Sequence, residues 1–123
     1  MPDGFFQVTK APSAGAGQAT VVALQLPQFM DSREFDRLNE QLLEVLGAQP
    51  RGRWVLDLSG VNYLGSSALG LMVNIRQRIR QSGGQLVLCC LSPRLLRIFQ
   101  TCCMERLFLI TRTVAEAIRE VGQ

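Results

Sequence analysis

The spacing of hydrophobic residues changes several times along the chain, and each change predicts a new element of secondary structure. Alternating or continuous apolar runs predict strands at 5–10, 19–26, 53–58, 85–91 and 107–111. Apolar residues at helical spacing predict helices at 30–47, 66–82, 92–103 and 114–121. Small residues over 11–18 predict a mobile hairpin loop between the first two strands.

The order of these elements predicts the fold class. After the opening hairpin, strands and helices alternate, which is typical of a mostly parallel central sheet with helical crossovers. A chain of 123 residues fits one domain, and a domain of this size buries about two thirds of the surface that its unfolded chain exposes. We therefore expect a single α/β domain over 1–123, with about four helices and a mostly parallel sheet opened by the N-terminal hairpin.

Two helix starts carry specific capping patterns. Asp31 and Glu34 have the spacing of a capping box at the start of the first helix. Ser92 is followed by Pro93, the order in which a serine cap precedes a proline in the first turn. Both patterns predict where a helix begins.

The predicted helix at 66–82 separates its residues into two faces. The apolar face, expected to contact the sheet, gathers Ala68, Leu71, Met72, Ile75 and Ile79. The opposite face gathers Gly70, Asn74, Gln77 and Gln81. At the start of the helix, Ser66 or Ser67 is expected to act as the cap by accepting a backbone N–H.

Composition and charge exclude several classes of protein. With 47% hydrophobic and 19% charged residues and no apolar run of about 18 residues, we expect a globular protein without membrane insertion. The start MPDGFFQVTK lacks the basic and apolar regions of a signal peptide, so a cytoplasmic location is expected. A net charge of +3 is too small to indicate nucleic-acid binding, and Arg76, Arg78 and Arg80 lie on different sides of their helix.

The cysteines do not match a metal or redox motif. They form two adjacent pairs, Cys89 with Cys90 and Cys102 with Cys103, and neighbours in a strand or helix are expected to point in different directions. The chain has no histidine, so a site of mixed cysteine and histidine ligands is excluded. An all-cysteine site would need both pairs to converge, and we expect instead buried, reduced cysteines, no bound metal and no cofactor.

The serine pair in SGVNYLGSSALGLMV lies where α/β proteins place functional sites, after a central strand. The segment 60–67 has the glycine spacing of a phosphate-binding P-loop but lacks its lysine. A hydrolase elbow needs glycine two residues after Ser67, where Leu69 stands, and no histidine base exists. Two interpretations of the serine pair therefore remain, a helix cap and a phosphorylated switch, and they are compatible with each other.

Two long segments resemble a known family. RWVLDLSGVNYLGSSALGLMV and SGGQLVLCCLSPRLLRIFQTCCMERLFLITRTVAEAI resemble the STAS domain, the family of bacterial anti-sigma factor antagonists and of regulatory domains attached to transporters. The resemblance runs from about Thr20 to Ile118 and is strongest from Trp54 onward. The hallmark of the family is an Asp-Ser-Ser/Thr-Gly box at the start of the helix after the central strand. The box here, with its acid and its glycine replaced, consists of Gly65, Ser66, Ser67 and Ala68.

The resemblance implies a regulatory module that is not an enzyme and that binds a protein partner. In the antagonists, the first serine of the box is phosphorylated by an anti-sigma factor that is itself a kinase, which makes Ser66 the candidate acceptor and Ser67 the second choice. The unphosphorylated protein binds the anti-sigma factor and frees the sigma factor, and charge at Ser66 would break the contact. The partner surface implied by the family consists of Gly65, Ser66, Ser67, Leu69, Gly70, Val73 and Arg76.

An alternative function stays open at this point. The small cytoplasmic STAS subunit of a bacterial lipid-transport ABC system is a constitutive part of a larger assembly. Gly65 in place of the acid favours such a subunit, whereas the serine pair favours the switch.

Two further positions allow more than one role. Leu69 and Val73 either pack against a neighbouring helix or form an apolar patch rimmed by Arg76 and Arg80. Asp57, an acid inside an apolar strand, needs a hydrogen-bond partner and is expected to hold the loop or the helix start below the serine pair.

Overall fold

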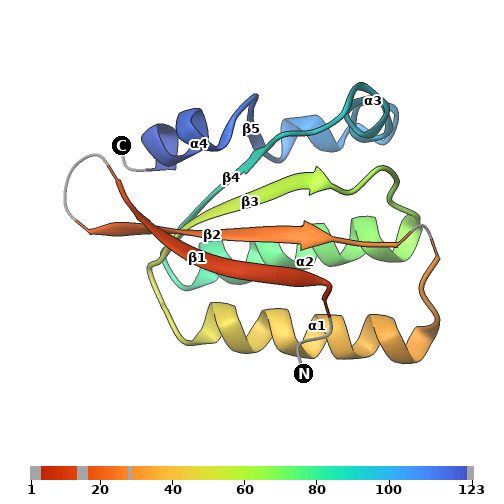
Figure 1. The fold of residues 1–123 in the computed structure, drawn as a ribbon, viewed down its shortest axis with the longest axis horizontal. Coiled ribbons are helices and arrows are strands. Elements are labelled where there is room, and N and C mark those ends of the chain that lie inside the picture. The colour runs from red at the N-terminus through yellow and green to blue at the C-terminus, as the bar shows by residue number, and fades with distance from the viewer. Residues whose placement is uncertain (1–3, 14–16, 28, 122–123) are drawn as a thin grey trace.

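Strands and helices follow one another in the predicted order (Figure 1). The computed structural model describes residues 4–13, 17–27 and 29–121. The strands are β1 (Phe6–Pro12), β2 (Gln18–Gln25), β3 (Arg53–Gly60), β4 (Gln85–Cys89) and β5 (Leu109–Thr111). The helices are α1 (Ser32–Gly47), α2 (Ser66–Gln81), α3 (Pro93–Thr101) and α4 (Val114–Val121), with a short 3-10 helix, η1 (Met104–Arg106), before β5. The centre of the predicted hairpin loop lies outside the described residues.

The strands form one five-stranded sheet in the order β1-β2-β3-β4-β5. β1 pairs antiparallel with β2, and each later neighbour pairs in parallel. The predicted α/β class, with a mostly parallel sheet opened by a hairpin, is therefore confirmed. Because the four parallel strands point the same way, the loops that follow them meet at one end of the sheet.

Alternation along β3 divides the core between the two faces of the sheet. Trp54, Leu56 and Leu58 belong to the cluster that includes the buried side chains of α1, α2 and α3. Val55 belongs to a second cluster, which includes Ala117 of α4. The helices α1 and α2 thus cover one face and α4 covers the other (Figure 1).

The amphipathic pattern of α2 is confirmed. Leu71, Met72, Ile75 and Ile79 are buried, and Ala68 is half-buried against the same core. The opposite face is exposed at Gly70, Asn74, Gln77 and Gln81.

The predicted caps of α1 and α3 are also confirmed. The Glu34 N–H donates to Asp31 Oδ1 over 2.7 Å, and the Asp31 N–H donates to Glu34 Oε1 over 3.1 Å. The Leu95 N–H donates to Ser92 Oγ over 3.1 Å. These reciprocal and local bonds satisfy backbone donors that a helix start leaves free.

Gly60 sets the path by which the chain leaves β3. A Cβ at this position would lie 2.6 Å from the carbonyl oxygen of Leu24, closer than any side chain allows. The β2–β3 register also shifts here, between Ala23 and Gln25. Glycine therefore lets the end of β3 lie directly beside the end of β2, which brings the loops after these two strands together.

Candidate functional site

A hollow of about 300 Å³ lies at the start of α2. The loop after β2, the loop after β3, the first turn of α2 and Phe35 of α1 form it together. Its lining is mostly apolar and consists of Leu26, Pro27, Phe29, Met30, Phe35, Tyr63, Leu64, Gly65, Ser66, Ser67 and Ala68. The structure therefore brings the predicted serine pair to the edge of an apolar surface depression.

The serine pair is exposed at the very start of α2, but neither side chain caps the helix. The N-cap is Gly65, with φ −80° and ψ −179°, and Ser66 and Ser67 are the first two helical residues. A capping side chain belongs to a residue with extended backbone, and here that residue is a glycine. The expectation that Ser66 or Ser67 accepts a backbone N–H is therefore wrong. Their hydroxyls face solvent beside the free N–H groups of the first turn.

Two aromatic residues in the hollow were not singled out by sequence reasoning. Phe29 is 83% exposed and Tyr63 is 41% exposed. The Arg94 guanidinium carbon lies 5.6 Å from the centre of the Tyr63 ring, within the range of a cation–π contact. An aromatic residue after a proline, between a strand and a helix cap, is the sequence feature that could have identified Phe29.

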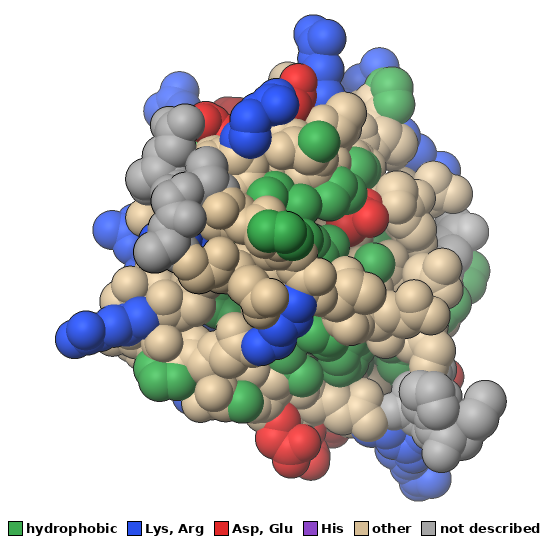
Figure 2. Space-filling model, turned by 60° about the vertical axis from the view of Figure 1, so that its left-hand side comes forward, with side chains coloured by type: hydrophobic (Ala, Val, Ile, Leu, Met, Phe, Trp, Pro, Cys, Tyr) green, Lys and Arg blue, Asp and Glu red, His purple; other side chains and the backbone are tan. Residues whose placement is uncertain are grey.

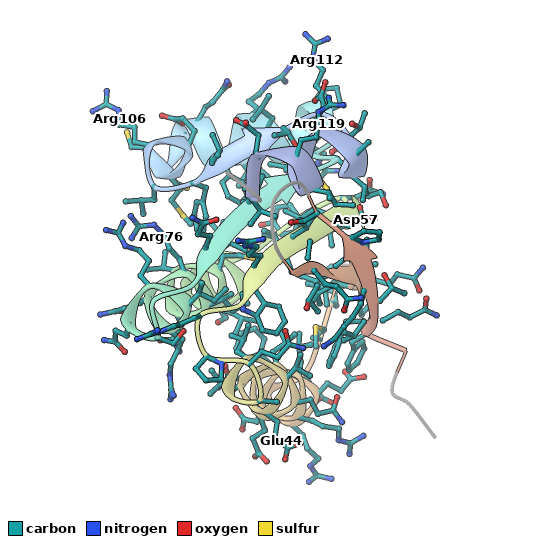
Figure 3. The ribbon with its side chains drawn as sticks, turned by 90° about the vertical axis from the view of Figure 1, so that its left-hand side faces the viewer. Glu44, Asp57, Arg76, Arg106, Arg112 and Arg119 are labelled. Carbon is teal, nitrogen blue, oxygen red and sulfur yellow. The ribbon has the colours of Figure 1, made fainter. Side chains whose placement is uncertain are left out.

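The other predicted partner residues of α2 lie in different environments. Leu69 and Val73 are half-buried and pack against the core, whereas Gly70 is exposed. The Nε–H of Arg76 donates to the carbonyl oxygen of Leu107, so this side chain ties α2 to the segment between η1 and β5. In Figure 3, Arg76 and Arg106 project on the same side of the molecule.

Asp57 lies on the face of the sheet opposite α2. It pairs with Cys89 in the β3–β4 register and lies on the side that faces α4 (Figure 3). Its Oδ1 accepts the Ser59 N–H over 2.9 Å. Ser59 still belongs to β3, so this bond lies within the strand, and the expected contact of Asp57 with the following loop stays a prediction. The expectation that it supports the start of α2 is wrong, because a residue at this register position points to the other face.

The two cysteine pairs differ from each other. Cys89 is buried and Cys90 half-buried, but Cys102 and Cys103 are exposed, so the expected burial of the second pair is wrong. Cys102 follows the last residue of α3, and Cys103 has a left-handed backbone with φ 57°, which turns the chain at the surface. Burial raises the pKa of the Cys89 thiol, and its hydrogen bond with Cys90 and the nearby negative charge of Asp57 raise this pKa further. Burial likewise raises the pKa of Cys90.

The face that Figure 2 shows has no large patch of basic or of acidic side chains. Basic and acidic groups lie mostly around the rim of this face, without a block of one sign, and hydrophobic side chains gather nearer its centre. Among the described residues, every helix is too short or too polar to span a bilayer.

Comparisons with known proteins place the chain among relatives of one kind. The sequence model of the STAS domain matches residues 14–117. A STAS-domain containing protein of Pseudomonas aeruginosa is 30% identical over 104 residues, which cover 85% of this chain and 98% of that protein. A candidate anti-sigma factor antagonist of Bordetella bronchiseptica, BtrV, is 39% identical over 64 residues, which cover 50% of this chain and 55% of that protein. The match with BtrV thus spans about half of that relative's length.

A comparison with solved structures finds STAS domain proteins as well. The solved structure of an anti-sigma-factor antagonist (STAS) domain protein from Planctomyces limnophilus has a TM-score of 0.77 and is 24% identical. The superposition covers 96% of this chain and 98% of that one. The overall arrangement of helices and strands is therefore shared along nearly the whole length of both chains.

Proposed function

The chain belongs to the STAS domain family, and on this basis we propose that it is a regulatory module that binds a protein partner in the manner of an anti-sigma factor antagonist. The observation that carries the proposal is the exposed serine pair at the edge of an apolar hollow. Such a module acts by contact, without catalysis, and in the cytoplasm. Its partner is an anti-sigma factor that is also a serine kinase.

The hollow supplies the apolar part of the contact. Phe29 is an exposed aromatic residue, and aromatic residues are enriched in the buried centre of protein interfaces. Tyr63 adds a second ring, and Arg94 lies against that ring. Aromatic residues and arginine are enriched in such contacts, which supports a protein partner over a small ligand in this open depression.

The exposed face of α2 extends the contact. Gly70 has no side chain, and a Cβ at this position would meet no atom within 4 Å, so a partner can approach the helix backbone closely there. Leu69 and Val73 border this strip from the core side. The proposed contact strip begins at Gly65, the N-cap of α2, and ends at Arg76, which is hydrogen-bonded to the carbonyl oxygen of Leu107.

Phosphorylation at Ser66 is the proposed switch. The first turn of α2 contains no acidic residue and its N-cap offers no side-chain hydrogen bond, so the helix start can accommodate negative charge. A phosphate would add about −1.5 to −2 charges beside the hollow. That charge is compatible with the helix but opposes an apolar contact, so it would release the partner while the fold stays intact.

The test begins with the identity of the partner. The protein, immobilised as wild type and as Phe29→Asp, is exposed to lysate of its native cell, and bound proteins are identified by mass spectrometry. We expect the wild type to retain a kinase-type anti-sigma factor that Phe29→Asp does not retain. Ala115→Asp, an exposed change on α4 at the opposite face of the sheet, is the matched control and retains the partner. An ATPase together with a permease in place of the kinase would support the constitutive subunit instead.

The switch is tested with the captured kinase. Phosphopeptide mapping is expected to find the phosphate on Ser66, and Ser66→Asp is expected to bind the partner more weakly than Ser66→Ala. Modification of Ser67 or Ser59 instead would contradict the assignment made from the family box.

A further inference from the structure

We propose that Asp57, Cys89 and Cys90 form a binding site for a thiophilic divalent cation of the zinc class. The ligand atoms of these three side chains all lie within 4.8 Å of one another, a grouping found nowhere else among the residues that the structure describes. The cluster is separate from the hollow at the start of α2, because it lies on the α4 side of the sheet.

The sheet register brings the first two ligands together. Asp57 and Cys89 are directly paired in neighbouring parallel strands, so their side chains project from the same face. Both lie near the carboxyl ends of these strands, the place where open α/β sheets build their ligand sites. The backbone thus holds the oxygen and the sulfur side by side without any flexible segment between them.

An unusual backbone conformation brings in the third ligand. In a continuous strand the Cys90 side chain would point away from that of Cys89. Cys90 instead has a left-handed backbone with φ 65°, and its Sγ lies 3.5 Å from Cys89 Sγ. The expectation that adjacent cysteines point apart is therefore wrong for this pair. Strained backbone at a non-glycine residue tends to occur where a side chain is held for a function.

The spacing and the donor types suit zinc. Two sulfur ligands on a tetrahedral zinc lie about 3.8 Å apart, since each Zn–S bond is about 2.3 Å. The observed 3.5 Å needs only a small adjustment. Thiolate ligands select soft cations over magnesium and calcium, and a carboxylate completes a set that zinc or cadmium accepts, with a fourth position open to water.

Neighbouring groups orient the ligands. The Ser59 N–H donates to Oδ1 of Asp57 over 2.9 Å, which holds the carboxylate in place. Val114, the first residue of α4, packs with Cys90 against the cluster that contains Cys89. Such second contacts fix ligand direction, and the helix start offsets part of the negative charge of two thiolates and a carboxylate. Asp57 and Cys90 are half-buried, which leaves a route for the ion from solvent.

Binding releases the two thiol protons and replaces the hydrogen bonds of the cluster with bonds to the ion. The ion would then connect the end of β3 with the end of β4 and the start of the loop that leads into α3. An ion that binds the folded chain and not the unfolded chain raises the melting temperature in proportion to the logarithm of its concentration above Kd.

The experiment uses the full chain with Cys102→Ser and Cys103→Ser, which removes the exposed thiols and leaves the cluster intact. Titration with Cd²⁺ alone is followed by the thiolate-to-cadmium charge-transfer band in the ultraviolet, and Zn²⁺ is then added as a competitor. We expect the band to saturate at one equivalent, Zn²⁺ to abolish it, and Zn²⁺ alone to raise the melting temperature until a chelator is added.

Two variants in this background test the ligands. Asp57→Asn keeps an acceptor for the Ser59 N–H but removes the charge, and we expect Cd²⁺ affinity to fall about ten-fold or more. Cys90→Asn tolerates the left-handed backbone and removes one thiolate, so the band and the affinity both fall further. Glu44→Gln, at an exposed carboxylate of α1 far from the cluster (Figure 3), is the control and binds as the background does.

Three results would each contradict the proposed metal site. Absence of the band in the background protein, or absence of any rise in its melting temperature with Zn²⁺, would overturn the site even if a variant fails to fold. Unchanged affinity in both Asp57→Asn and Cys90→Asn would overturn it as well.

Discussion

A side chain at Gly70 is expected to separate the stability of the fold from the binding of its partner. Gly70 lies within the first two turns of α2, on the exposed face, and a Cβ at this position meets no atom within 4 Å. Its φ lies outside the left-handed region, so an L residue fits the backbone without strain. A substitution there therefore changes the surface of the helix and leaves its packing untouched.

A side chain at position 70 is expected to raise the stability of the fold, whereas a long side chain there is expected to lower the affinity for the partner. Glycine in a helix interior is about 1 kcal/mol less favourable than alanine, so Gly70→Ala should raise the free energy of unfolding by about that amount. Arginine has a helix propensity close to that of alanine, and Gly70→Arg should gain slightly less. In the complex, however, the long side chain of Gly70→Arg would fill the space that the partner needs. A loss of about 2 kcal/mol or more is typical at the centre of an interface, which corresponds to about thirty-fold in Kd.

The assay pairs urea unfolding, followed by circular dichroism, with titration of the captured partner. Gly70→Ala is the matched control, because it has the same gain in stability with only one added methyl group. If Gly70→Arg bound the partner as tightly as the wild type, the exposed face of α2 would not belong to the contact. If Gly70→Ala lowered the stability, the reasoning about open space at this position would be wrong.

Three further substitutions and one labelling experiment test the structure in different places. Met72 is 1% exposed, so Met72→Ala should cost about 2–5 kcal/mol of stability through lost burial and a cavity; an unchanged urea midpoint would show that the face of α2 is misassigned. Ser66 makes no capping bond, so Ser66→Ala should shift the free energy of unfolding by less than about 0.5 kcal/mol, and a loss near 1 kcal/mol would indicate a cap in solution. Leu69→Asp puts a charge on a half-buried side chain that packs against the core, so its melting temperature should drop well below that of the wild type, whereas an unchanged melt would mean that Leu69 belongs to the free surface. An aromatic disulfide reagent at neutral pH should modify Cys102 before Cys89, because the thiolate is the reactive form and burial raises the pKa of Cys89; mass spectrometry after brief labelling shows the order.

Features that depend on nearby residues could be predicted from the sequence. The capping box of α1 needs only Asp31 and Glu34, three positions apart, and it forms as expected. The faces of α2 follow from helical spacing alone, since a side chain every three or four positions returns to the same side. The order of the elements and the parallel sheet follow from the same kind of pattern.

Features that depend on the path of the chain between elements could not be predicted. Whether Gly65 or Ser66 is the N-cap is decided by how the loop leaves β3, and that path is set by the approach of Gly60 to the end of β2. The direction of Cys90 depends on one left-handed residue at the end of β4. The strand ends at Cys89, two residues before the predicted end at residue 91, so the alternation of side chains no longer applies to Cys90.

The candidate site was located in part. The serine pair and the exposed face of α2 were placed correctly by their positions in the helix. Phe29 was missed because it belongs to another loop, and only the sheet brings the loops after β2 and β3 together. Such a meeting of distant segments depends on strand order and register, which hydrophobic spacing does not specify.

The alternation of β3 limits how this protein can vary over evolution. Asp57 faces α4 and the adjacent Leu58 faces the layer of α1 and α2, so one strand supplies two surfaces at once. Because consecutive strand residues project to opposite sides, gaining or losing a single residue inside the strand would exchange them. The carboxylate would then enter the apolar layer under α2, and the leucine would lie among the groups that face α4. The chain can therefore change length in its loops, but between Arg53 and Gly60 it can vary only by substitution.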